Sequence, residues 1–354
     1  MPMKQVHKNH KLRLSFQPME LVMKHVFTVA GNSRFSTPII LTEIEYDGLV
    51  GFGEASLPPY LQETQDSVIR FLTGLDLSQF SNPLETENIL QYVSQIAPGN
   101  MAAKASIDIA IHDLAGKFVN KPLHEIWGYD KAQTPYTSFT IGLDSLDMIK
   151  KKTQEAASYP ILKVKLGKDN DKEIIEAIRR ITDKPIYADV NQGWKDKTHA
   201  LAMTYWLKER GVVFIEQPLP KEQLTDIAWL TGRSPIPVIA DEGIQDMNDL
   251  QKFHGYYTGV NIKLMKCGGL LEARKMIEFA RNKGMKVMIG CMTETSCAIS
   301  AAAHLTPTAD YADLDGSLLI KNDVFVGMKI VDGKITLNDQ PGIGITKQDF
   351  PFKK

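Results

Sequence analysis

Residues 161–191 read ILKVKLGKDNDKEIIEAIRRITDKPIYADVN. The stretch begins and ends with short runs rich in Val, Ile or Tyr, at 161–167 and 185–191, which are typical of buried β-strands. Between them, residues 171–182 carry apolar side chains at the spacing of an amphipathic helix. We therefore predict a strand–helix–strand unit, the building block of a parallel sheet.

The same unit recurs along residues 137–317. Eight strand-like runs each end in a polar side chain, and successive end residues lie 25, 24, 27, 25, 22, 28 and 24 positions apart. These end residues are Thr140, Lys165, Asp189, Glu216, Asp241, Lys263, Cys291 and Asp315. Eight units of steady length predict a closed TIM-type barrel. An open doubly wound sheet is the alternative, although such sheets usually have fewer units.

The regions on either side of the barrel have a different pattern. Strand-like runs at 12–19 and 39–55 precede a long helical pattern at 101–120, which predicts an α+β capping domain over residues 1–125. We expect the barrel over 126–320 and a tail of short strands, 321–354, that returns to the cap. The GFGEA stretch at 51–55 lacks the third glycine of a phosphate loop, and we interpret it as a turn of the cap.

Composition limits the class of protein. The 354 residues are 43% hydrophobic and 23% charged, as in an ordinary soluble globular protein, and the net charge of −1 favours neither nucleic acid nor an anionic membrane as partner. The polar N-terminus lacks the apolar core of a signal peptide, and no apolar run approaches the ~18 residues of a membrane span. Three cysteines without metal-type spacing fit a reduced, cytoplasmic protein, and a homo-oligomer is compatible with the sequence.

Three acidic strand ends suggest a metal site. In a barrel of this kind the reacting groups lie at the carboxyl ends of the strands, so Asp189, Glu216 and Asp241 share one mouth. A single acid at such a position is as often a helix cap or a loop salt bridge. Three that converge repel one another unless a cation neutralises them, and oxygen-only ligands suit Mg²⁺. We therefore predict that these carboxylates bind magnesium.

Two lysines suggest proton transfer at carbon. Lys165 and Lys263 lie on the second and sixth strands, on opposite sides of the three acids. A substrate carboxylate bound to the metal would place its α-carbon between two amines, so that one face loses a proton and the other gains one. Lys163 points to the same face of its strand as Lys165. We expect it to add positive charge beside the substrate carboxylate and to favour the neutral amine of Lys165.

A set of motifs resembles a known family. KVK (163–165), DVNQGW (189–194), EQP (216–218), ADE (240–242), NIKLMKCGG (261–269) and AKASIDIAIHDLAGK (103–117) are similar to the muconate-lactonizing subgroup of the enolase superfamily. The resemblance covers nearly the whole chain. It implies a modified barrel of seven βα units plus a last strand, (β/α)7β, beneath an α+β capping domain, with Mg²⁺ and a lysine base.

The subgroup contains several activities, so the rest of the substrate must decide among them. Asp313 and Asp315, in DLDG, share one face, and dipeptide epimerases carry such a pair at this position, where it would hold the substrate ammonium. The resemblance thus implies a dipeptide epimerase that inverts the α-carbon of the C-terminal residue, with Thr140, Cys291 and Thr293 contacting the dipeptide backbone. The alternatives are an enzyme of the o-succinylbenzoate synthase or N-acylamino acid racemase type, or a barrel that binds without catalysis.

One departure from the family bears on specificity. Members that act on Ala-Glu use an arginine of a cap loop to bind the glutamate side chain. The corresponding segment here, 27–38, places Asn32 near that position, and Arg34 could substitute only if the loop shifts. We therefore expect a preference for an apolar or neutral second residue, with Phe27, Val29 and Phe35 available to line the pocket.

Overall fold

Eight short parallel strands form the centre of the protein. The structure is a computed structural model that describes residues 10–29 and 32–348. Every strand of this sheet pairs with its neighbours in chain order. The strands are β4 (Phe139–Ile141), β5 (Leu162–Lys165), β6 (Ile186–Asp189), β7 (Val212–Glu216), β8 (Val238–Ala240), β9 (Gly259–Lys263), β10 (Lys286–Gly290) and β11 (Tyr311–Asp313).

The sheet closes on itself. A parallel bridge joins Thr137, beside β4, to Ala312 of β11, and the N–H of Ser138 donates to the Ala312 carbonyl at 3.2 Å. A sheet whose first and last strands meet in this way is a barrel, not an open doubly wound sheet. The predicted closed barrel is therefore confirmed.

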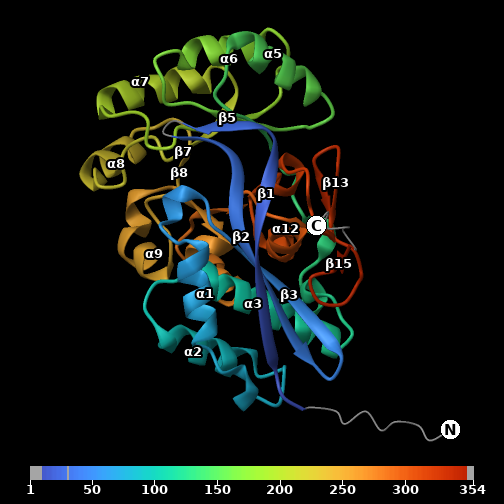
Figure 1. Ribbon diagram of the computed structural model, residues 1–354. Coiled ribbons are helices and arrows are strands. Elements are labelled where there is room, and N and C mark those ends of the chain that lie inside the picture. Colours follow the sequence, from blue (N-terminus) through green and yellow to red (C-terminus); the bar gives the residue numbers. More distant parts are fainter. Residues whose placement is uncertain (1–9, 30–31, 349–354) are drawn as a thin grey trace, which may run out of the picture.

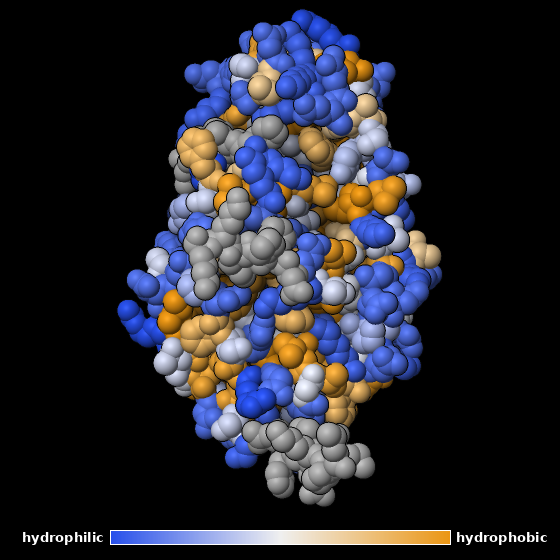
Figure 2. Space-filling view, turned by 45° about the vertical axis from the view of Figure 1, so that its right-hand side comes forward, coloured by the Kyte–Doolittle hydropathy of each residue, from blue (hydrophilic) through white to orange (hydrophobic). Residues whose placement is uncertain are grey.

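Helices connect successive strands on the outside of the barrel (Figure 1). Seven helical connections and a last strand give the (β/α)7β arrangement that the resemblance implied. Figure 2 shows mainly hydrophilic residues over the barrel helices at the top of the molecule, as expected where amphipathic helices turn their polar faces to water, and a mixture of hydrophilic and hydrophobic residues below them. The helices are α5 (Leu146–Glu155), α6 (Asp171–Arg179), α7 (Lys197–Lys208), α8 (Leu224–Thr231), α9 (Met247–Phe253), α10 (Leu264–Cys267) with α11 (Leu270–Asn282), and α12 (Ser296–Ala303).

Side chains inside the barrel form two layers. Tyr187, Phe214, Ile239 and Met288 fill the lower layer as a small buried cluster of their own. Since side chains on a strand alternate between its two faces, the positions two residues further on point into the same interior. Three of those positions carry the acids of β6, β7 and the end of β8, so the apolar layer forms a dry floor beneath the predicted metal site.

The cap is an antiparallel sheet covered by helices. It contains β1 (Arg13–Val29), β2 (Asn32–Tyr46), β3 (Leu49–Ser56), α1 (Gln65–Thr73), α2 (Thr86–Ile96), α3 (Met101–Phe118) and α4 (Leu123–Ile126). The expectation of a loop over 27–38 is wrong for its described residues, because 27–29 belong to β1 and 32–38 to β2. Figure 1 shows the long β1–β2 hairpin running toward the barrel helices.

The glycines of GFGEA lie within a strand. The interpretation of residues 51–55 as a turn is wrong, because they belong to β3. A Cβ on Gly51 would lie 2.1 Å from the carbonyl oxygen of Ala110, and one on Gly53 would lie 1.9 Å from that of Ser106. Both oxygens belong to α3. Glycine is therefore required because this helix packs directly on the strand backbone.

The tail returns to the cap, as expected. Its strands are β12 (Phe325–Val326), β13 (Lys329–Val331), β14 (Lys334–Thr336) and β15 (Thr346–Lys347). The ring of Phe325 lies 5.3 Å from that of Phe52 in β3, and the N–H of Ile343 donates to Asp113 of α3 at 2.9 Å.

Short 3-10 helices lie at Pro59–Leu61, Leu77–Gln79, Lys131–Gln133, His254–Tyr256, Thr306–Thr308 and Gly316–Leu319. None of the helices within residues 10–29 and 32–348 has the length and apolar character needed to cross a membrane.

Candidate active site

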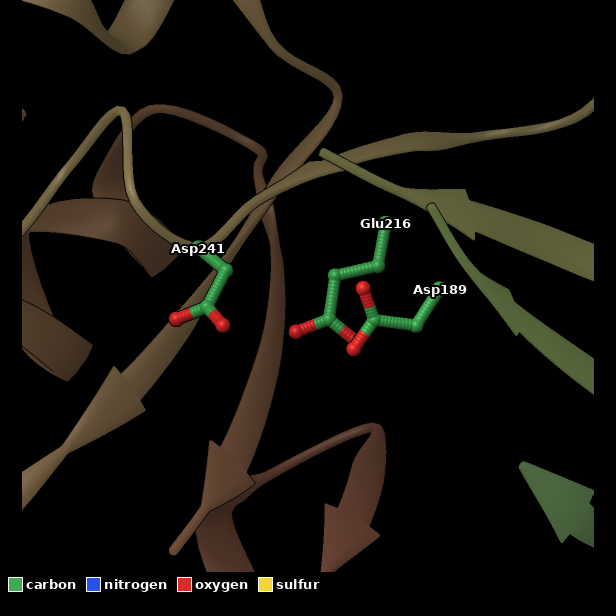
Figure 3. A group of neighbouring side chains, drawn as sticks. All are labelled: Asp189, Glu216 and Asp241. Atoms are coloured by element: carbon green, nitrogen blue, oxygen red, sulfur yellow. The ribbon is translucent and has the colours of Figure 1, made fainter. Parts of the chain in front are cut away.

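The three predicted acids converge at the carboxyl ends of their strands. One oxygen each from Asp189, Glu216 and Asp241 lies within 4.8 Å of the other two, and all three residues are buried. Figure 3 shows the carboxylates of Asp189 and Glu216 facing that of Asp241. Three buried carboxylates at this spacing form an oxygen-only donor set, which fits Mg²⁺ with positions left for water or substrate.

The charge of this cluster is partly compensated by lysines. Burial and the neighbouring Asp189 carboxylate raise the pKa of Glu216 to about 8. Burial acts in the same direction on Asp241, but Lys263 and Lys266 outweigh it and hold the pKa of Asp241 well below its usual range. A divalent cation at this position would add positive charge beside Glu216 and favour its ionised form.

The two predicted catalytic lysines flank the acids. The Nζ of Lys165 on β5 lies 2.6 Å from Asp189 Oδ2, and the Nζ of Lys263 on β9 lies 2.7 Å from Asp241 Oδ2. Strands β6, β7 and β8 separate β5 from β9 in the barrel. Both amines line one cavity of about 440 Å³. Although burial opposes it, Asp241 holds the pKa of Lys263 well above its usual range.

Lys163 is the counter-ion of several acids. It is 1% exposed, and its Nζ lies 2.6 Å from Asp313, 2.8 Å from Glu216 and 3.1 Å from Asp189. Although burial opposes it, these carboxylates, Asp313 foremost, hold the pKa of Lys163 well above its usual range. Direct contact between Lys163 and substrate stays a prediction, since its charge is already shared among acids.

Asp313 and Asp315 both line the cavity, but their partners differ. Asp313 accepts from Lys163 and from the Ser138 hydroxyl at 2.9 Å. Asp315 accepts from the N–H of Thr140 at 2.8 Å, and no lysine or arginine within the described residues lies within 4.0 Å of it. Burial and the Asp313 carboxylate raise the pKa of Asp315 to about 7. Asp315 is therefore the acid that a bound ammonium would complement.

The remaining predicted contacts also reach the cavity. Thr140, Cys291 and Thr293 line it, and so does Arg34 of the cap. The Nη2 of Arg34 donates to Thr293 Oγ1 at 2.8 Å, and its guanidinium carbon lies 5.9 Å from the centre of the Tyr60 ring. The segment expected to be a loop forms part of the β1–β2 hairpin, and Arg34 in β2 brings a cation to the cavity without an arginine at position 32.

This placement removes the reason for expecting an apolar pocket. Phe35 is 72% exposed and lies outside the cavity, so its predicted lining role is wrong. The side chains of Phe27, Val29 and Asn32 lie outside the described residues.

Sequence reasoning missed residues that hold the predicted metal ligands in place. Asn261 Nδ2 donates to Glu216 Oε1 at 2.7 Å, and Lys266 Nζ donates to Asp241 Oδ1 at 2.7 Å. Asn261 could have been found, because it lies two positions before Lys263 and so faces the same interior. Lys266 lies in α10, just after β9, so the alternation of side chains along a strand does not indicate where it points. The cavity is also lined by Asn191, Gln192, Lys221, Glu242 and Gln245.

A (β/α)7β barrel whose strand ends present three carboxylates between two lysines defines an enzyme class of the enolase type. The description "Enolase C-terminal domain-like" matches residues 147–349, and "Mandelate racemase / muconate lactonizing enzyme, N-terminal domain" matches residues 17–128. The chain belongs to this family of the enolase superfamily.

Similar proteins share both sequence and fold. The L-Ala-D/L-Glu epimerase of Bacteroides thetaiotaomicron is 58% identical over 338 residues, which are 95% of this chain and 88% of that protein. The substrate-liganded L-Ala-D/L-Glu epimerase from Bacillus subtilis superposes with a TM-score of 0.90 at 27% identity, covering 96% and 99% of the two chains. A dipeptide epimerase from Methylococcus capsulatus, in complex with Mg and L-Arg-D-Lys, gives 0.88 at 28% identity, covering 95% and 99%.

Proposed function

We propose that the protein is a magnesium-dependent dipeptide epimerase that inverts the α-carbon of the C-terminal residue. The observation that carries this proposal is the pair of amines at β5 and β9. Each contacts one of the converging carboxylates, and both line the same cavity from strands that three others separate. A protein that only binds a ligand gains nothing from two amines flanking one carbon atom.

The two lysines would exchange roles between enantiomers. Magnesium, held by Asp189, Glu216 and Asp241, would act as a Lewis acid on the substrate carboxylate. The Nζ of Lys165 or Lys263, as the neutral amine, would take the α-proton, and the electrons of the C–H bond would remain on the substrate. For Lys263 this requires that magnesium offset the charge of Asp241, the carboxylate that otherwise raises the pKa of this amine. The ammonium of the other lysine then delivers a proton to the opposite face. The net result is inversion at carbon with no change in composition.

The free amino group of a dipeptide would explain why the cavity contains the buried acid Asp315. This buried carboxylate has no cationic side chain within 4.0 Å among the described residues, and a substrate ammonium would compensate its charge. N-acylated amino acids and succinylbenzoate precursors carry no such ammonium. This difference favours a dipeptide over the substrates of the two related enzyme types.

We further propose that the second residue of the preferred dipeptide is acidic. Arg34 and Lys221 both line the cavity and provide positive charge for a side-chain carboxylate. The 58% identical relative from Bacteroides thetaiotaomicron is named for L-Ala-D/L-Glu. Comparing turnover of L-Ala-L-Glu with that of L-Ala-L-Phe tests this, because a preference for the phenylalanine dipeptide would support the apolar pocket instead.

Proton NMR in D₂O tests the activity itself. With Mg²⁺ present, we expect a dipeptide library to show α-proton exchange and a second diastereomer at the C-terminal residue, without release of water. Dehydration would point to a synthase of the o-succinylbenzoate type, and exchange restricted to N-acylated amino acids would point to a racemase. If none of these substrates shows exchange, the reading of the protein as a barrel that binds without catalysis would be favoured.

We also propose a cytoplasmic location, which the three free cysteines, Cys267, Cys291 and Cys297, support.

A further inference from the structure

The loop after β10 is where the cap meets the cavity. Residues 291–295, CMTET, connect β10 to α12, and Cys291 and Thr293 line the cavity. Two cap side chains that line the same cavity contact this loop: Arg34 donates to the Thr293 hydroxyl, and the Tyr60 hydroxyl donates to Met292 Sδ at 3.0 Å. The position of this loop therefore affects both the cap contact and the shape of the cavity.

Strand β3 holds the same loop from behind. The hydroxyl of Ser56 donates to the Thr293 carbonyl oxygen at 2.6 Å. The carboxylate of Glu54 accepts from the N–H of Thr295 at 3.0 Å and from its hydroxyl. Glu54 and Ser56 lie two positions apart and face the barrel, whereas Gly51 and Gly53 on the other face lie against α3. We name Glu54 and Ser56 the β3 clamp.

The buried carboxylate of Glu54 is costly for a merely structural contact. Glu54 is 0% exposed, and no lysine or arginine among the described residues lies within 4.0 Å of it. Burial and the nearby Glu294 raise the pKa of Glu54 to about 8. Both carboxyl oxygens of Glu54 accept from Thr295, the N-cap residue of α12, whereas an amide side chain has only one acceptor oxygen for its N–H and hydroxyl. A buried polar group with specific partners instead fixes a single geometry.

We propose that the β3 clamp is a positioning device for the substrate loop: Glu54 and Ser56 fix the main chain of 293–295 so that Cys291 and Thr293 face the dipeptide correctly. The inference rests on the proposed function, since it assigns the clamp to binding of that substrate. Neither clamp residue lines the cavity, so both act through the loop. One face of β3, with Gly51 and Gly53, thus packs closely on α3, and the other face, with Glu54 and Ser56, positions the loop.

Two conservative variants and a matched control test the proposal. Glu54→Gln and Ser56→Ala should each raise KM for the dipeptide about tenfold and change kcat by less than about threefold, because they displace a binding loop and leave the lysines in place. Asp323→Asn is the control. Asp323 accepts from the N–H and hydroxyl of Ser296, at 2.9 and 2.7 Å, and so binds the start of the same helix, with no hydrogen bond to residues 291–295 within the described part of the chain. It should lower thermal stability but leave KM within about twofold.

Hydrogen exchange gives a readout that does not depend on activity. In the ligand-free protein, the peptide covering residues 291–295 should exchange faster in both clamp variants than in the wild type and in Asp323→Asn, whose altered hydrogen bond lies at Ser296, outside this peptide. Unchanged exchange, or KM values that match those of the control, would overturn the clamp. If the wild type shows no α-proton exchange with any dipeptide, the proposed function fails instead. Faster amide hydrogen exchange in the clamp variants would then support only the statement that Glu54 and Ser56 hold the loop in place.

Discussion

The Nζ of Lys163 lies 2.6 Å from Oδ2 of Asp313, joining the second strand of the barrel to the last one across β4. The same amine lies 2.8 Å from Glu216 and 3.1 Å from Asp189. One buried cation is thus shared by three buried carboxylates. Lys163 therefore stabilises the barrel interior, in addition to any effect that it has on substrate.

Replacing Lys163 should destabilise the metal-free protein severely. Lys163→Met keeps the length of the side chain but leaves three buried acids without their shared cation, which we expect to cost about 3–5 kcal/mol. Urea denaturation in EDTA measures this, and excess Mg²⁺ should restore part of the loss by supplying positive charge. Lys121→Met is the control, since the Lys121–Glu125 pair is about half exposed and should contribute less than ~1 kcal/mol. If Lys163→Met lowers the free energy of unfolding by no more than Lys121→Met does, Lys163 is not the counter-ion of these acids.

The barrel and its reacting groups could be predicted from sequence because strands have a simple geometry. Side chains alternate with a period of two, and parallel strands in a barrel end at one rim. The residue type at each strand end, such as Glu216 on β7 or Lys263 on β9, therefore fixes which groups meet. No knowledge of loop structure is needed for that inference.

Pairings that depend on barrel curvature or on loops could not be predicted. Lys163 and Asp313 are 150 positions apart, and their contact depends on how closely β4 lets its two neighbours approach. Arg34 illustrates a further case, because the direction in which the β1–β2 hairpin extends determines whether the guanidinium reaches the cavity or points to water. Phe35, the next residue, is exposed instead, and periodicity alone could not distinguish the two outcomes.

Each catalytic lysine should be needed for epimerisation but not for metal binding. Lys165→Ala and Lys263→Ala each remove one of the two proton carriers, so we expect turnover to fall at least ~10³-fold, below the detection limit of a polarimetric assay. Exchange of the α-proton in D₂O should survive for one enantiomer in at least one variant, because the remaining amine still faces that proton. Calorimetry should give Mg²⁺ affinities close to that of the wild type. Complete loss of Mg²⁺ binding in both variants would mean that the lysines hold the metal site together.

The charge of Asp315 should make dipeptide binding pH-dependent. Its pKa is raised from 3.8 to about 7 in the folded protein, so folding favours its protonated form, and this carboxyl lowers stability as the pH rises from about 4 to about 7. An ammonium needs the ionised form, so dipeptide affinity should increase over the upper part of that range. As the pH falls below 7 and Asp315 becomes protonated, the ratio of kcat/KM between wild type and Asp315→Asn should fall toward one.

Asp315→Asn should also discriminate between substrates. At pH 8 it should weaken binding of free dipeptides by about tenfold or more, with little effect on N-acetylated analogues that lack the ammonium. Asp313→Asn is a poorer probe, because it also removes a partner of Lys163. Equal losses for free and N-acetylated dipeptides in Asp315→Asn would show that the ammonium binds elsewhere.

Lys266 should control metal affinity without touching the metal. Its Nζ lies within 3.3 Å of four oxygens: Asp241 Oδ1 and the carbonyls of Asp241, Ile244 and Asn261. These contacts tie the end of β8 to β9 and orient the Asp241 carboxylate. Lys266→Met should therefore weaken Mg²⁺ binding about 10–100-fold by calorimetry, as loss of a residue that orients a ligand usually does. Lys275→Met, which alters an exposed pair with Glu272 on α11, should leave the affinity unchanged. If Lys266→Met loses stability but retains wild-type affinity, the lysine supports the loop and does not orient Asp241.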